Sequence, residues 1–434
     1  MPKLFGTDGV RGKPGKDLTA ELALRLGAAC GSLVGEGTVL LARDTRESGP
    51  FLAAALAAGF MAQGVDVLDA GVAPTPAVSY LVGRLGLRAG GVVSASHNPA
   101  EDNGIKFLDE KGDKFSEAME DEVEARLSAD HPLPLRFGRL TFREDVLEIY
   151  IQHLVASLPG KFPRWKVVLD CAHGATYRTA PEAFTRSGLE VVVTGAEPNG
   201  RNINDGVGSQ HPEALREAVL RHGAVAGFAF DGDGDRCLAV TEEGVILGGD
   251  EMLAIFARDL PPGQTVVGTV MTNGGLEAYL KDRGLRLLRT PVGDRHVAAA
   301  MEAHGAPFGG ESSGHVIIRA FARTGDGTLT ALQLLQKMKE HGRPLGELIR
   351  DFRPWPSVQK AIPLPAGFFY RKEDVQDLLE AAEKALSGSG RILVRPSGTE
   401  PVLRVLVEGR DGDRVQATAA WLVDALAERM GSGK

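Results

Sequence analysis

Short, almost continuous apolar runs alternate with longer helical patterns between residues 38 and 315. An apolar strand, a helix, a second strand and a third strand follow one another over 38–99, and the same order recurs over 165–235 and 265–315. Apolar strands of this kind are typical of parallel sheets covered by helices on both faces. Strand–helix–strand spacing also requires right-handed crossovers. The pattern therefore predicts three similar α/β units with mixed, largely parallel sheets.

The pattern changes after Trp355 and Pro356. The segments that follow are a strand, a helix, two strands and a closing helix, expected at 360–367, 374–388, 391–401, 402–410 and 413–430. This order indicates a small α+β domain. Because 434 residues exceed what a single hydrophobic core supports, we predict four domains, at 1–150, 151–250, 251–357 and 358–434.

Each of the three α/β units ends its third strand in an unusual polar loop. The loops are SASHNP at 94–99, DGDGDR at 231–236 and GGESSGH at 309–315. In open α/β sheets, ligands bind beyond the carboxyl ends of the strands. Because the three loops occupy equivalent places, we expect them to line one shared cleft.

The loop DGDGDR alternates aspartate with glycine directly after an apolar strand. In an extended segment this spacing points Asp231, Asp233 and Asp235 the same way. Carboxylates about 4 Å apart repel by roughly 4 kcal/mol per pair at an effective dielectric constant of about 20. A divalent cation relieves that repulsion, and all-oxygen ligands favour Mg²⁺. A solvated acidic turn is the alternative, whereas an EF-hand is rejected because Arg236 stands where that loop needs glycine and a strand precedes it.

The segment RPSGTEP joins two apolar strands near the C-terminus. Arg395 and Arg404 supply positive charge, and Ser397, Gly398 and Thr399 supply hydroxyl and backbone N–H donors in a turn. This combination suits a phosphate group. A plain hairpin loop is the alternative.

The loop GGESSGH offers Glu311, Ser313 and His315 on a turn that is rich in glycine. A carboxylate beside hydroxyl and imidazole groups can hydrogen-bond the adjacent hydroxyl groups of a sugar, or an amine. A structural turn is the alternative.

Ser96 lies in the first polar loop and is the candidate for covalent chemistry. No GxSxG signature of a serine hydrolase accompanies it. A phosphoserine here would add an oxygen to the metal shell of the aspartates. Arg11, His97 and Lys106 are the candidate cations that balance charge while a phosphoryl group moves, because such transfers depend on positioning and electrostatics. A purely structural serine is the alternative.

Composition narrows the class of protein. The hydrophobic share of 43% and the charged share of 24% are average for soluble globular proteins. The net charge of −8 argues against nucleic acid or a membrane surface as the main partner. Cys30, Cys171 and Cys237 form no CxxC pair, which predicts reduced, buried thiols. The N-terminus lacks an apolar signal segment and the apolar stretch at 51–62 is too short to cross a bilayer, so we expect a cytoplasmic protein.

Five motifs in this order, over essentially the whole chain, resemble those of the α-D-phosphohexomutases. They are FGTDGVRG at 5–12, followed by SASHNP, DGDGDR, GGESSGH and RPSGTEP. The resemblance implies four domains in a heart-shaped arrangement around a central active-site cleft. It implies that Ser96 is phosphorylated and that Ser96, Asp231, Asp233 and Asp235 bind Mg²⁺. The substrate would be held by Arg236, Asp294, Arg295, Glu311, Ser313, His315, Arg395, Ser397, Gly398, Thr399 and Arg404.

Three segments are most similar to the family members that act on glucosamine phosphate, namely FGTDGVRG, NGIKF at 103–107 and VGDRHV at 292–297. The resemblance then implies conversion of glucosamine 6-phosphate to glucosamine 1-phosphate through a 1,6-bisphosphate, which supplies UDP-N-acetylglucosamine synthesis. A hexosamine or hexose 1,6-bisphosphate would serve as activator, and a homodimer is compatible with the sequence. Ser312 stands where the family usually has Gln, and Val207 where a cysteine is usual. Both departures weaken the inference that the substrate sugar is glucosamine.

Several alternatives stay open. Phosphomannomutase and phosphoglucomutase activities belong to the same family, and the general acid or base is undecided among Lys106, Arg11, His97 and His315. A Mg²⁺-dependent sugar-phosphate phosphatase and a non-catalytic sugar-phosphate binder are alternatives of other classes. A mutase isomerises its substrate, which a non-catalytic binder does not do. It also releases no net phosphate, which distinguishes it from a phosphatase.

Overall fold

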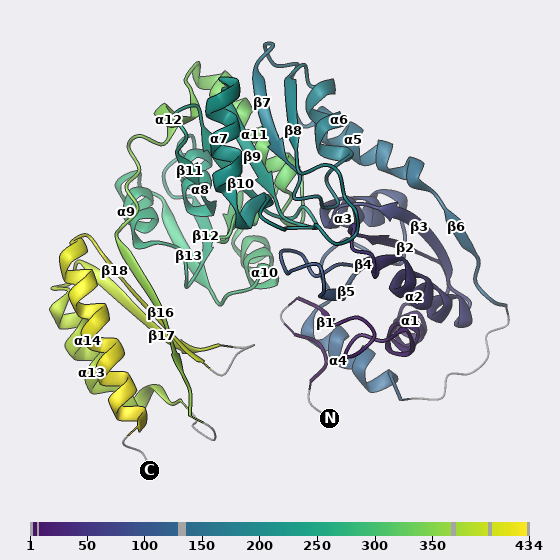
Figure 1. The fold of residues 1–434 in the computed structure, drawn as a ribbon, viewed down its shortest axis with the longest axis horizontal. Helices are drawn as coiled ribbons and strands as arrows, with labels where there is room; N and C mark the ends of the chain where they lie inside the picture. The colour runs from purple at the N-terminus through teal and green to yellow at the C-terminus, as the bar shows by residue number, and fades with distance from the viewer. Residues whose placement is uncertain (1–2, 7, 129–135, 366–369, 398–401, 432–434) are drawn as a thin grey trace.

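The computed structural model describes residues 3–6, 8–128, 136–365, 370–397 and 402–431. The described chain forms sheets of six, five, four and three strands. Figure 1 shows these four sheets arranged in an arc, with the N-terminal sheet at one end and the C-terminal sheet at the other.

The first three sheets share a core of three parallel strands. The central strand is β2 (Thr38–Arg43), β7 (Lys166–Asp170) or β12 (Thr265–Thr269). One neighbour is β3 (Asp66–Val72), β8 (Glu190–Thr194) or β13 (Arg286–Thr290). The other neighbour is β4 (Ala89–Val93), β9 (Ala226–Phe230) or β14 (Phe308–Gly310). These are the strands predicted for each α/β unit, so the predicted repeat is confirmed.

Each third strand also pairs with an antiparallel strand that the sequence analysis did not predict. This strand is β5 (Asn103–Leu108), β10 (Cys237–Thr241) or β15 (Val316–Ile318). The three polar loops therefore connect the third strand of each unit to its antiparallel neighbour, and all three leave the carboxyl end of a parallel strand. The remaining strands of these sheets are edge strands, β1 (Val10–Gly12), β6 (Leu140–Phe142) and β11 (Ile246–Leu247).

Helices cover the faces of these sheets. In the first sheet's region they are α1 (Ala20–Val34), α2 (Gly49–Ala62), α3 (Thr75–Leu85) and α4 (Glu117–Arg126), and α5 (Leu147–Ala156) lies beside α3 and the second sheet's helices (Figure 1). Beside the second sheet they are α6 (Thr179–Arg186) and α7 (Pro212–His222). The third is accompanied by α8 (Gly249–Ala257), α9 (Gly274–Asp282), α10 (Asp294–His304), α11 (Gly327–His341) and α12 (Leu345–Leu348).

Helices α1 and α2 approach each other unusually closely through glycine. A Cβ atom on Gly27 would lie 2.1 Å from the carbonyl oxygen of Leu56, and one on Gly59 would lie 2.1 Å from that of Leu24. No side chain fits there, so these two glycines set the separation of the helices. Helix α2 contains the whole apolar stretch at 51–62, which is a core helix as expected.

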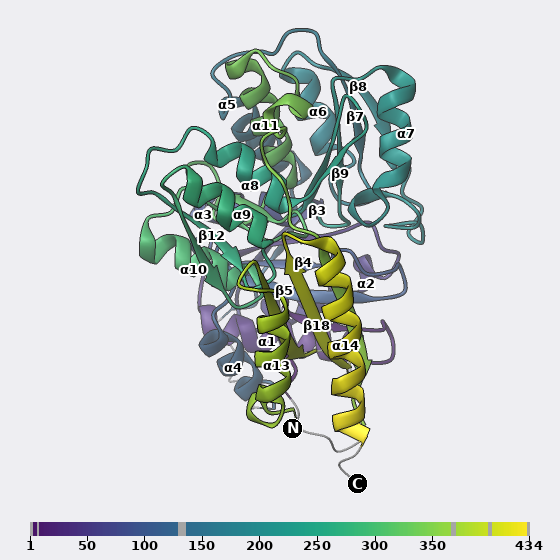
Figure 2. The same ribbon diagram turned by 90° about the vertical axis from the view of Figure 1, so that its left-hand side faces the viewer.

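The C-terminal domain is smaller and has one covered face. Its sheet has the order β16 (Ser357–Pro363), β18 (Val402–Gly409) and β17 (Gly390–Pro396), and all of its pairs are antiparallel. Helices α13 (Gln376–Ala385) and α14 (Gly412–Gly431) lie side by side on one face of the sheet, as Figure 2 shows. The opposite face is turned toward the inside of the arc (Figure 1).

The described residues form five hydrophobic clusters, three of which lie within the first, second and third domains respectively. One continuous cluster joins the first three sheets, from Leu40 through Phe228 to Leu332. The C-terminal domain has a separate cluster that includes Val405 and Leu422. The three cysteines are buried and free, as predicted. Among the described helices, none has the length and apolar character needed to cross a bilayer.

Candidate functional site

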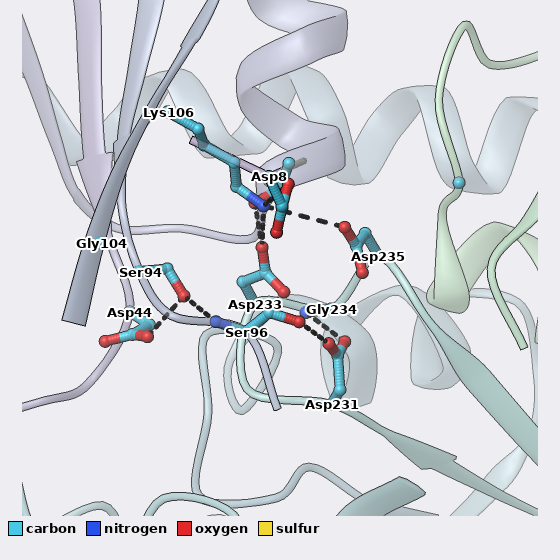
Figure 3. Close-up of polar contacts among 12 residues, drawn as sticks. Asp8, Asp44, Ser94, Ser96, Gly104, Lys106, Asp231, Asp233, Gly234 and Asp235 are labelled. Carbon is cyan, nitrogen blue, oxygen red and sulfur yellow. Dashed lines mark hydrogen bonds and ion pairs between the residues drawn. The ribbon is translucent and has the colours of Figure 1, made fainter. Parts of the chain in front are cut away.

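The loop after β4 meets the loop after β9. The hydroxyl of Ser96 donates a hydrogen bond of 2.5 Å to Oδ2 of Asp231, although the two residues are 135 positions apart. Both side chains are buried. Figure 3 shows Ser96 directed at the acidic loop. The expected convergence of these two loops is therefore present in the fold.

The three aspartates of the second loop form a compact acidic group. One oxygen of each lies within 4.8 Å of those of the others, and all three residues are buried. Gly234 allows the turn, because its φ of 75° is in the left-handed region that favours glycine. The backbone N–H groups of Gly234 and Arg236 donate to Oδ1 of Asp231, at 3.1 and 3.2 Å.

This acidic group fits a divalent cation. Among the described residues, the Oδ1 atoms of Asp233 and Asp235 are buried without a hydrogen-bond partner. A buried carboxylate oxygen that lacks a partner is costly, and a cation would remove that cost. The donor set consists of oxygen atoms only, including the nearby hydroxyl of Ser96, which is the set that Mg²⁺ prefers.

Lys106 partly neutralises the acidic group. Its ammonium lies 2.5 Å from Oδ2 of Asp233 and 3.8 Å from Oδ2 of Asp235. Burial raises the pKa of Asp233, but the charge of Lys106 outweighs burial and holds that pKa below its ordinary value. Burial and the neighbouring carboxylates raise the pKa of Asp231 and of Asp235. The three aspartates are thus chemically unequal.

A chain of ion pairs continues from Lys106 toward the third loop. Asp8 lies 3.8 Å from Lys106 and 2.5 Å from Lys114, and Lys114 lies 2.5 Å from Asp294. Figure 3 shows Asp8 and Asp233 on either side of the Lys106 ammonium. Burial lowers the pKa of Lys114, but the carboxylates of Asp294 and Asp8 outweigh it and raise that pKa above its ordinary value. Lys114 therefore stays charged and links the N-terminal segment to the third domain.

The proposed cationic partners of Ser96 differ in charge. Nδ1 of His97 lies 3.3 Å from the hydroxyl of Ser96. Burial and the charges of Arg236 and Arg11 lower the pKa of His97 to about 4, so the imidazole is neutral near pH 7. Arg11 contacts the same loop by donating to Asn98 at 3.1 Å and is paired with Asp8.

The third loop lies beside the second. One ligand atom each of Asp235, Asp294 and His315 lies within 4.8 Å of the others. Nε2 of His315 accepts a hydrogen bond from the backbone N–H of Gly325 at 3.2 Å and lies 3.4 Å from Asp294. The three polar loops thus meet in one region.

The remaining predicted sugar-binding residues have different environments. Glu311 accepts a hydrogen bond of 3.0 Å from the backbone N–H of Gly293, so the segments GGESSGH and VGDRHV are in contact. Ser313 is exposed. Arg295 forms a two-point ion pair with Glu120 of helix α4, at 2.9 and 3.0 Å, which joins the third domain to the first. Arg236 lies 4.0 Å from Asp235.

The predicted phosphate-binding arginines line a separate cavity. Arg395 and Arg404 are directly opposite each other on β17 and β18. They line a cavity of about 240 Å³ together with Lys360 and with Met271 of the third domain. Burial and the charge of Arg404 lower the pKa of Arg395. Ser397 donates its backbone N–H to Val402 at 2.9 Å, whereas Gly398 and Thr399 lie outside the described residues.

Polar contacts attach this cavity's domain to the third domain. Glu408 accepts hydrogen bonds from the backbone N–H of Gly274 at 2.7 Å and from Nε of Arg391 at 2.5 Å. Arg391 also donates to the carbonyl oxygen of Thr272 at 2.7 Å. The loop after β12, which carries Met271, is therefore the junction between the two domains.

Sequence reasoning missed several charged residues of the site, namely Asp8, Asp44, Arg46 and Lys114. The side chains of Asp44 and Arg46 are fully buried, and both residues follow β2 at the carboxyl end of its strand. The rule that identified the three polar loops applies equally to this fourth strand end. The position of Asp44 and Arg46 at the carboxyl end of β2 could therefore have identified them from the sequence. Asp8 lies in the motif FGTDGVRG, from which only Arg11 was selected, whereas no comparable pattern marks Lys114.

Four domains of one protein family match consecutive parts of the chain. They are described as phosphoglucomutase/phosphomannomutase alpha/beta/alpha domains I, II and III and the C-terminal domain, and they match residues 2–132, 148–244, 248–354 and 361–425. The phosphoglucosamine mutase of Streptomyces coelicolor is 44% identical over 99% of this chain and 100% of its own length. The chain belongs to the phosphoglucomutase/phosphomannomutase family.

Other members of the phosphoglucomutase/phosphomannomutase family agree with this. The phosphoglucosamine mutase of Thermobifida fusca is 45% identical over 99% of both chains. A phosphoglucomutase/phosphomannomutase family protein of Burkholderia thailandensis superposes with a TM-score of 0.82 at 28% identity, over 98% of this chain and 97% of that one. The fold also resembles Aspergillus fumigatus N-acetylphosphoglucosamine mutase, solved with GlcNAc-6P and magnesium, with a TM-score of 0.69 at 17% identity over 98% and 96% of the two chains. The predicted fold class and the family resemblance are confirmed.

Proposed function

We propose that this protein is a phosphoglucosamine mutase that converts glucosamine 6-phosphate to glucosamine 1-phosphate through a phosphorylated Ser96. The observation that carries the proposal is the hydrogen bond of 2.5 Å between Ser96 and the acidic group. It occurs in a chain that is 44–45% identical over almost its full length to proteins named phosphoglucosamine mutase.

In the first half-reaction, the 1-hydroxyl oxygen of the substrate attacks the phosphorus of phosphoserine 96. The new O–P bond forms as the bond to the serine oxygen breaks, and the hydroxyl proton passes to a base. In the second half-reaction the bisphosphate has turned round, and the serine oxygen attacks the phosphorus of the 6-phosphate. The bond between that phosphorus and the 6-oxygen breaks, and the 6-oxygen takes up the proton that the base received. Ser96 is thereby phosphorylated again. A hexosamine or hexose 1,6-bisphosphate can load Ser96 in the same way.

Asp231, Asp233 and Asp235 together with Ser96 would hold Mg²⁺, which supplies positive charge beside the transferring phosphoryl group. Lys106 adds a fixed positive charge from the other side of Asp233, at 2.5 Å. Positioned charge of this kind is the main source of catalysis in phosphoryl transfer. His97 and Lys106 are the candidates nearest to the reaction for moving the substrate proton, with Arg11 and His315 farther along the same network.

The substrate phosphate that does not react would bind Arg395, Ser397 and Arg404, with Gly398 and Thr399 of the same segment. The cavity of about 240 Å³ supports this role because its charged lining residues are all cationic. Glu311, Ser313 and His315 would contact the sugar, and Arg236, Asp294 and Arg295 would complete the site.

A substrate panel tests the proposed function. The protein, loaded with Mg²⁺ and glucose 1,6-bisphosphate, is assayed with the 6-phosphates of glucosamine, N-acetylglucosamine, glucose and mannose. We expect the highest kcat/KM for glucosamine 6-phosphate and no release of inorganic phosphate. A higher kcat/KM for mannose 6-phosphate or glucose 6-phosphate would instead indicate a phosphomannomutase or a phosphoglucomutase. Inorganic phosphate released in step with substrate loss would indicate a phosphatase.

We also propose domain boundaries after residues 150, 250 and 357. The first two fall between the last strand of one sheet and the first strand of the next, within helices α5 and α8, and the third falls at the start of β16. A cytoplasmic location, the lack of nucleic-acid and membrane partners and a homodimer stay predictions. Size-exclusion chromatography with light scattering tests the homodimer.

A further inference from the structure

Backbone strain is concentrated around Ser96. The described chain has five non-glycine residues with positive φ, and four of them are Ser96, Ala172, His173 and Asn204, with φ values of 52°, 54°, 49° and 60°. A residue with a Cβ atom avoids this region. Such strain persists only where the surrounding structure holds it, and it gathers at functional sites.

The four strained residues belong to one hydrogen-bonded network. The backbone N–H of Asn204 donates to the carbonyl oxygen of Ala172 at 2.9 Å. The hydroxyl of Thr45 donates to the backbone carbonyl oxygen of His173. The side-chain amide of Asn204 donates to the carbonyl oxygens of Ser96 and Asn98, at 2.9 and 3.0 Å. A residue of the second domain thus holds the serine loop of the first.

Arg46 holds the same loop from within the first domain. Its guanidinium has five N–H groups, and each has an acceptor. Nε donates to Asp44 at 2.9 Å. The other four N–H groups are directed at backbone carbonyl oxygens of the serine loop, those of Ser96 at 3.0 Å, Asn98 at 2.8 Å, Asp102 at 2.9 Å and Pro99.

Asp44 completes the arrangement. Its Oδ2 accepts a hydrogen bond of 2.6 Å from the hydroxyl of Ser94, which in turn accepts one of 2.9 Å from the backbone N–H of Ser96. Figure 3 shows this connection from Asp44 through Ser94 to Ser96. The backbone on both sides of Ser96 is therefore fixed by hydrogen bonds that do not use its hydroxyl, at its N–H through Ser94 and at its carbonyl oxygen through Arg46 and Asn204.

We propose that Arg46 and Asn204 are positioning residues, which hold the loop 94–102 in its strained form so that the hydroxyl of Ser96 faces the acidic group. Both act through backbone carbonyl oxygens of the serine loop. The proposal rests on the proposed role of Ser96 as phosphoryl carrier. It adds a function for two residues outside the motifs of the family resemblance.

Two variants test this proposal and a third is the control. Arg46→Lys keeps the positive charge but can donate to fewer of the carbonyl oxygens, because an ammonium has three N–H groups and no fixed fork. Asn204→Gly removes the amide and also relieves the positive φ, so its effect on stability is small. Ser387→Gly relieves the same kind of strain at φ 51° in the C-terminal domain, away from Ser96.

We expect kcat to fall by about 100-fold in Arg46→Lys and by roughly tenfold in Asn204→Gly, because a displacement of about 1 Å costs on the order of 100-fold in rate. KM for the sugar phosphate should stay within about threefold, since Arg395 and Arg404 are untouched. Ser387→Gly should keep wild-type kcat. A purely structural role would lower the melting temperature and leave kcat per folded molecule unchanged.

Folded Arg46→Lys and Asn204→Gly enzymes with kcat within about threefold of wild type would overturn the proposal. If Arg46→Lys does not fold, Asn204→Gly decides the question alone. Phosphate analysis of the wild-type protein separates this outcome from failure of the proposed function. A wild type that isomerises its substrate but carries no phosphate on Ser96 refutes the phosphoserine role itself, whereas unchanged variants of a phosphorylated enzyme refute only the positioning role.

Discussion

Around Ser96 buried carboxylates and cations alternate, whereas the charged residues that line the Arg395 cavity are all cations. Asp8, Lys106, Asp233 and Lys114 neutralise one another over distances of 2.5 to 3.8 Å. In the second region Arg395 and Arg404 face each other across two strands, with Lys360 in the same wall. Like charges directly opposite on a sheet destabilise it.

The difference follows from what each region is proposed to bind. The network around Ser96 must hold its shape before and after transfer, so its charges are balanced by the protein itself. The Arg395 cavity retains excess positive charge, which favours capture of an anion from solution. The same kind of substitution should therefore have opposite effects on stability in the two regions.

The largest effect is expected at Ser96. Ser96→Ala should reduce mutase activity by at least about 1000-fold, because no group remains to carry the phosphoryl unit. Its melting temperature should stay close to wild type. Ser32→Ala, which removes a half-buried hydroxyl of helix α1 in the same domain, should keep full activity. Intact-mass measurement should find phosphate on the wild type and not on Ser96→Ala; isomerisation by the alanine variant would exclude Ser96 as carrier.

Removing the cation from the balanced network should destabilise the protein strongly. Lys106→Met leaves Asp233 without its cationic partner, whereas Asp8 keeps Lys114 and Arg11. Breaking a buried pair by removing one member costs about 3–5 kcal/mol. Urea unfolding followed by circular dichroism measures this loss. An unfolding free energy within about 1 kcal/mol of wild type would mean that Asp233 does not depend on Lys106 for compensation.

The matching change in the second region should spare stability and weaken binding. Arg395→Met relieves repulsion from Arg404, so the unfolding free energy should stay within about 0.5 kcal/mol or rise, while KM should rise about tenfold or more and kcat should fall. Glucose 6-phosphate should raise the melting temperature of wild type and not of the variant. Lys384→Met removes a cation from helix α13 on the opposite face of the sheet and should change neither KM nor the thermal shift. If Arg395→Met and Lys384→Met have equal KM values, the substrate phosphate does not bind in this cavity.

The smallest effect concerns Asp250, which lies between the two regions. It accepts hydrogen bonds from Ser312 at 3.0 Å and from the backbone N–H of Asn273 at 2.9 Å. Burial raises its pKa to about 7. Between pH 4 and 7 the folded protein therefore retains a proton that the unfolded chain has released, so Asp250 makes the wild type less stable as pH rises through this window.

Asp250→Asn should remove this dependence. The variant should gain stability relative to wild type between about pH 4 and 7, by on the order of 1–3 kcal/mol, and the difference should be constant above that range. Melting temperatures measured across this pH range test the prediction. Glu243→Gln, a change at an exposed carboxyl of the second domain, should show no such trend. A constant difference at all pH values would mean that Asp250 has an ordinary pKa.

Much of the fold was predictable because the sequence repeats it. The order of strand, helix, strand and strand occurs three times, and the polar loops stand at the same strand ends, so the meeting of Ser96 with Asp231 followed from one rule about parallel sheets. The antiparallel strands β5, β10 and β15 were missed. They directly follow the polar loops, and β15 has only three residues, Val316–Ile318, which is too short for an alternating pattern to mark it as a strand.

The supporting charges were less accessible from sequence. Lys114 meets Asp294 only because the first and third domains pack together, and no motif marks Lys114. Asp8 lies within the motif FGTDGVRG, but its pairing with Lys114, 106 positions away, becomes visible only in the fold. Arg46 was missed for a different reason. Its guanidinium is fully buried and donates to backbone carbonyl oxygens, and such acceptors are present in every sequence and distinguish none.

The separate hydrophobic core of the C-terminal domain has a consequence for how this protein can be altered. Residues such as Val405 and Leu422 pack among themselves, and the junction described here depends on Glu408, Arg391 and the loop after β12. A chimera that takes residues 358–434 from a relative with another sugar preference would leave intact the hydrophobic core of the C-terminal domain and the hydrophobic clusters of the other three domains. Among the described residues, the polar contacts at the junction are what such a chimera would need to match, so the proposed phosphate site could be exchanged without changing the residues around Ser96.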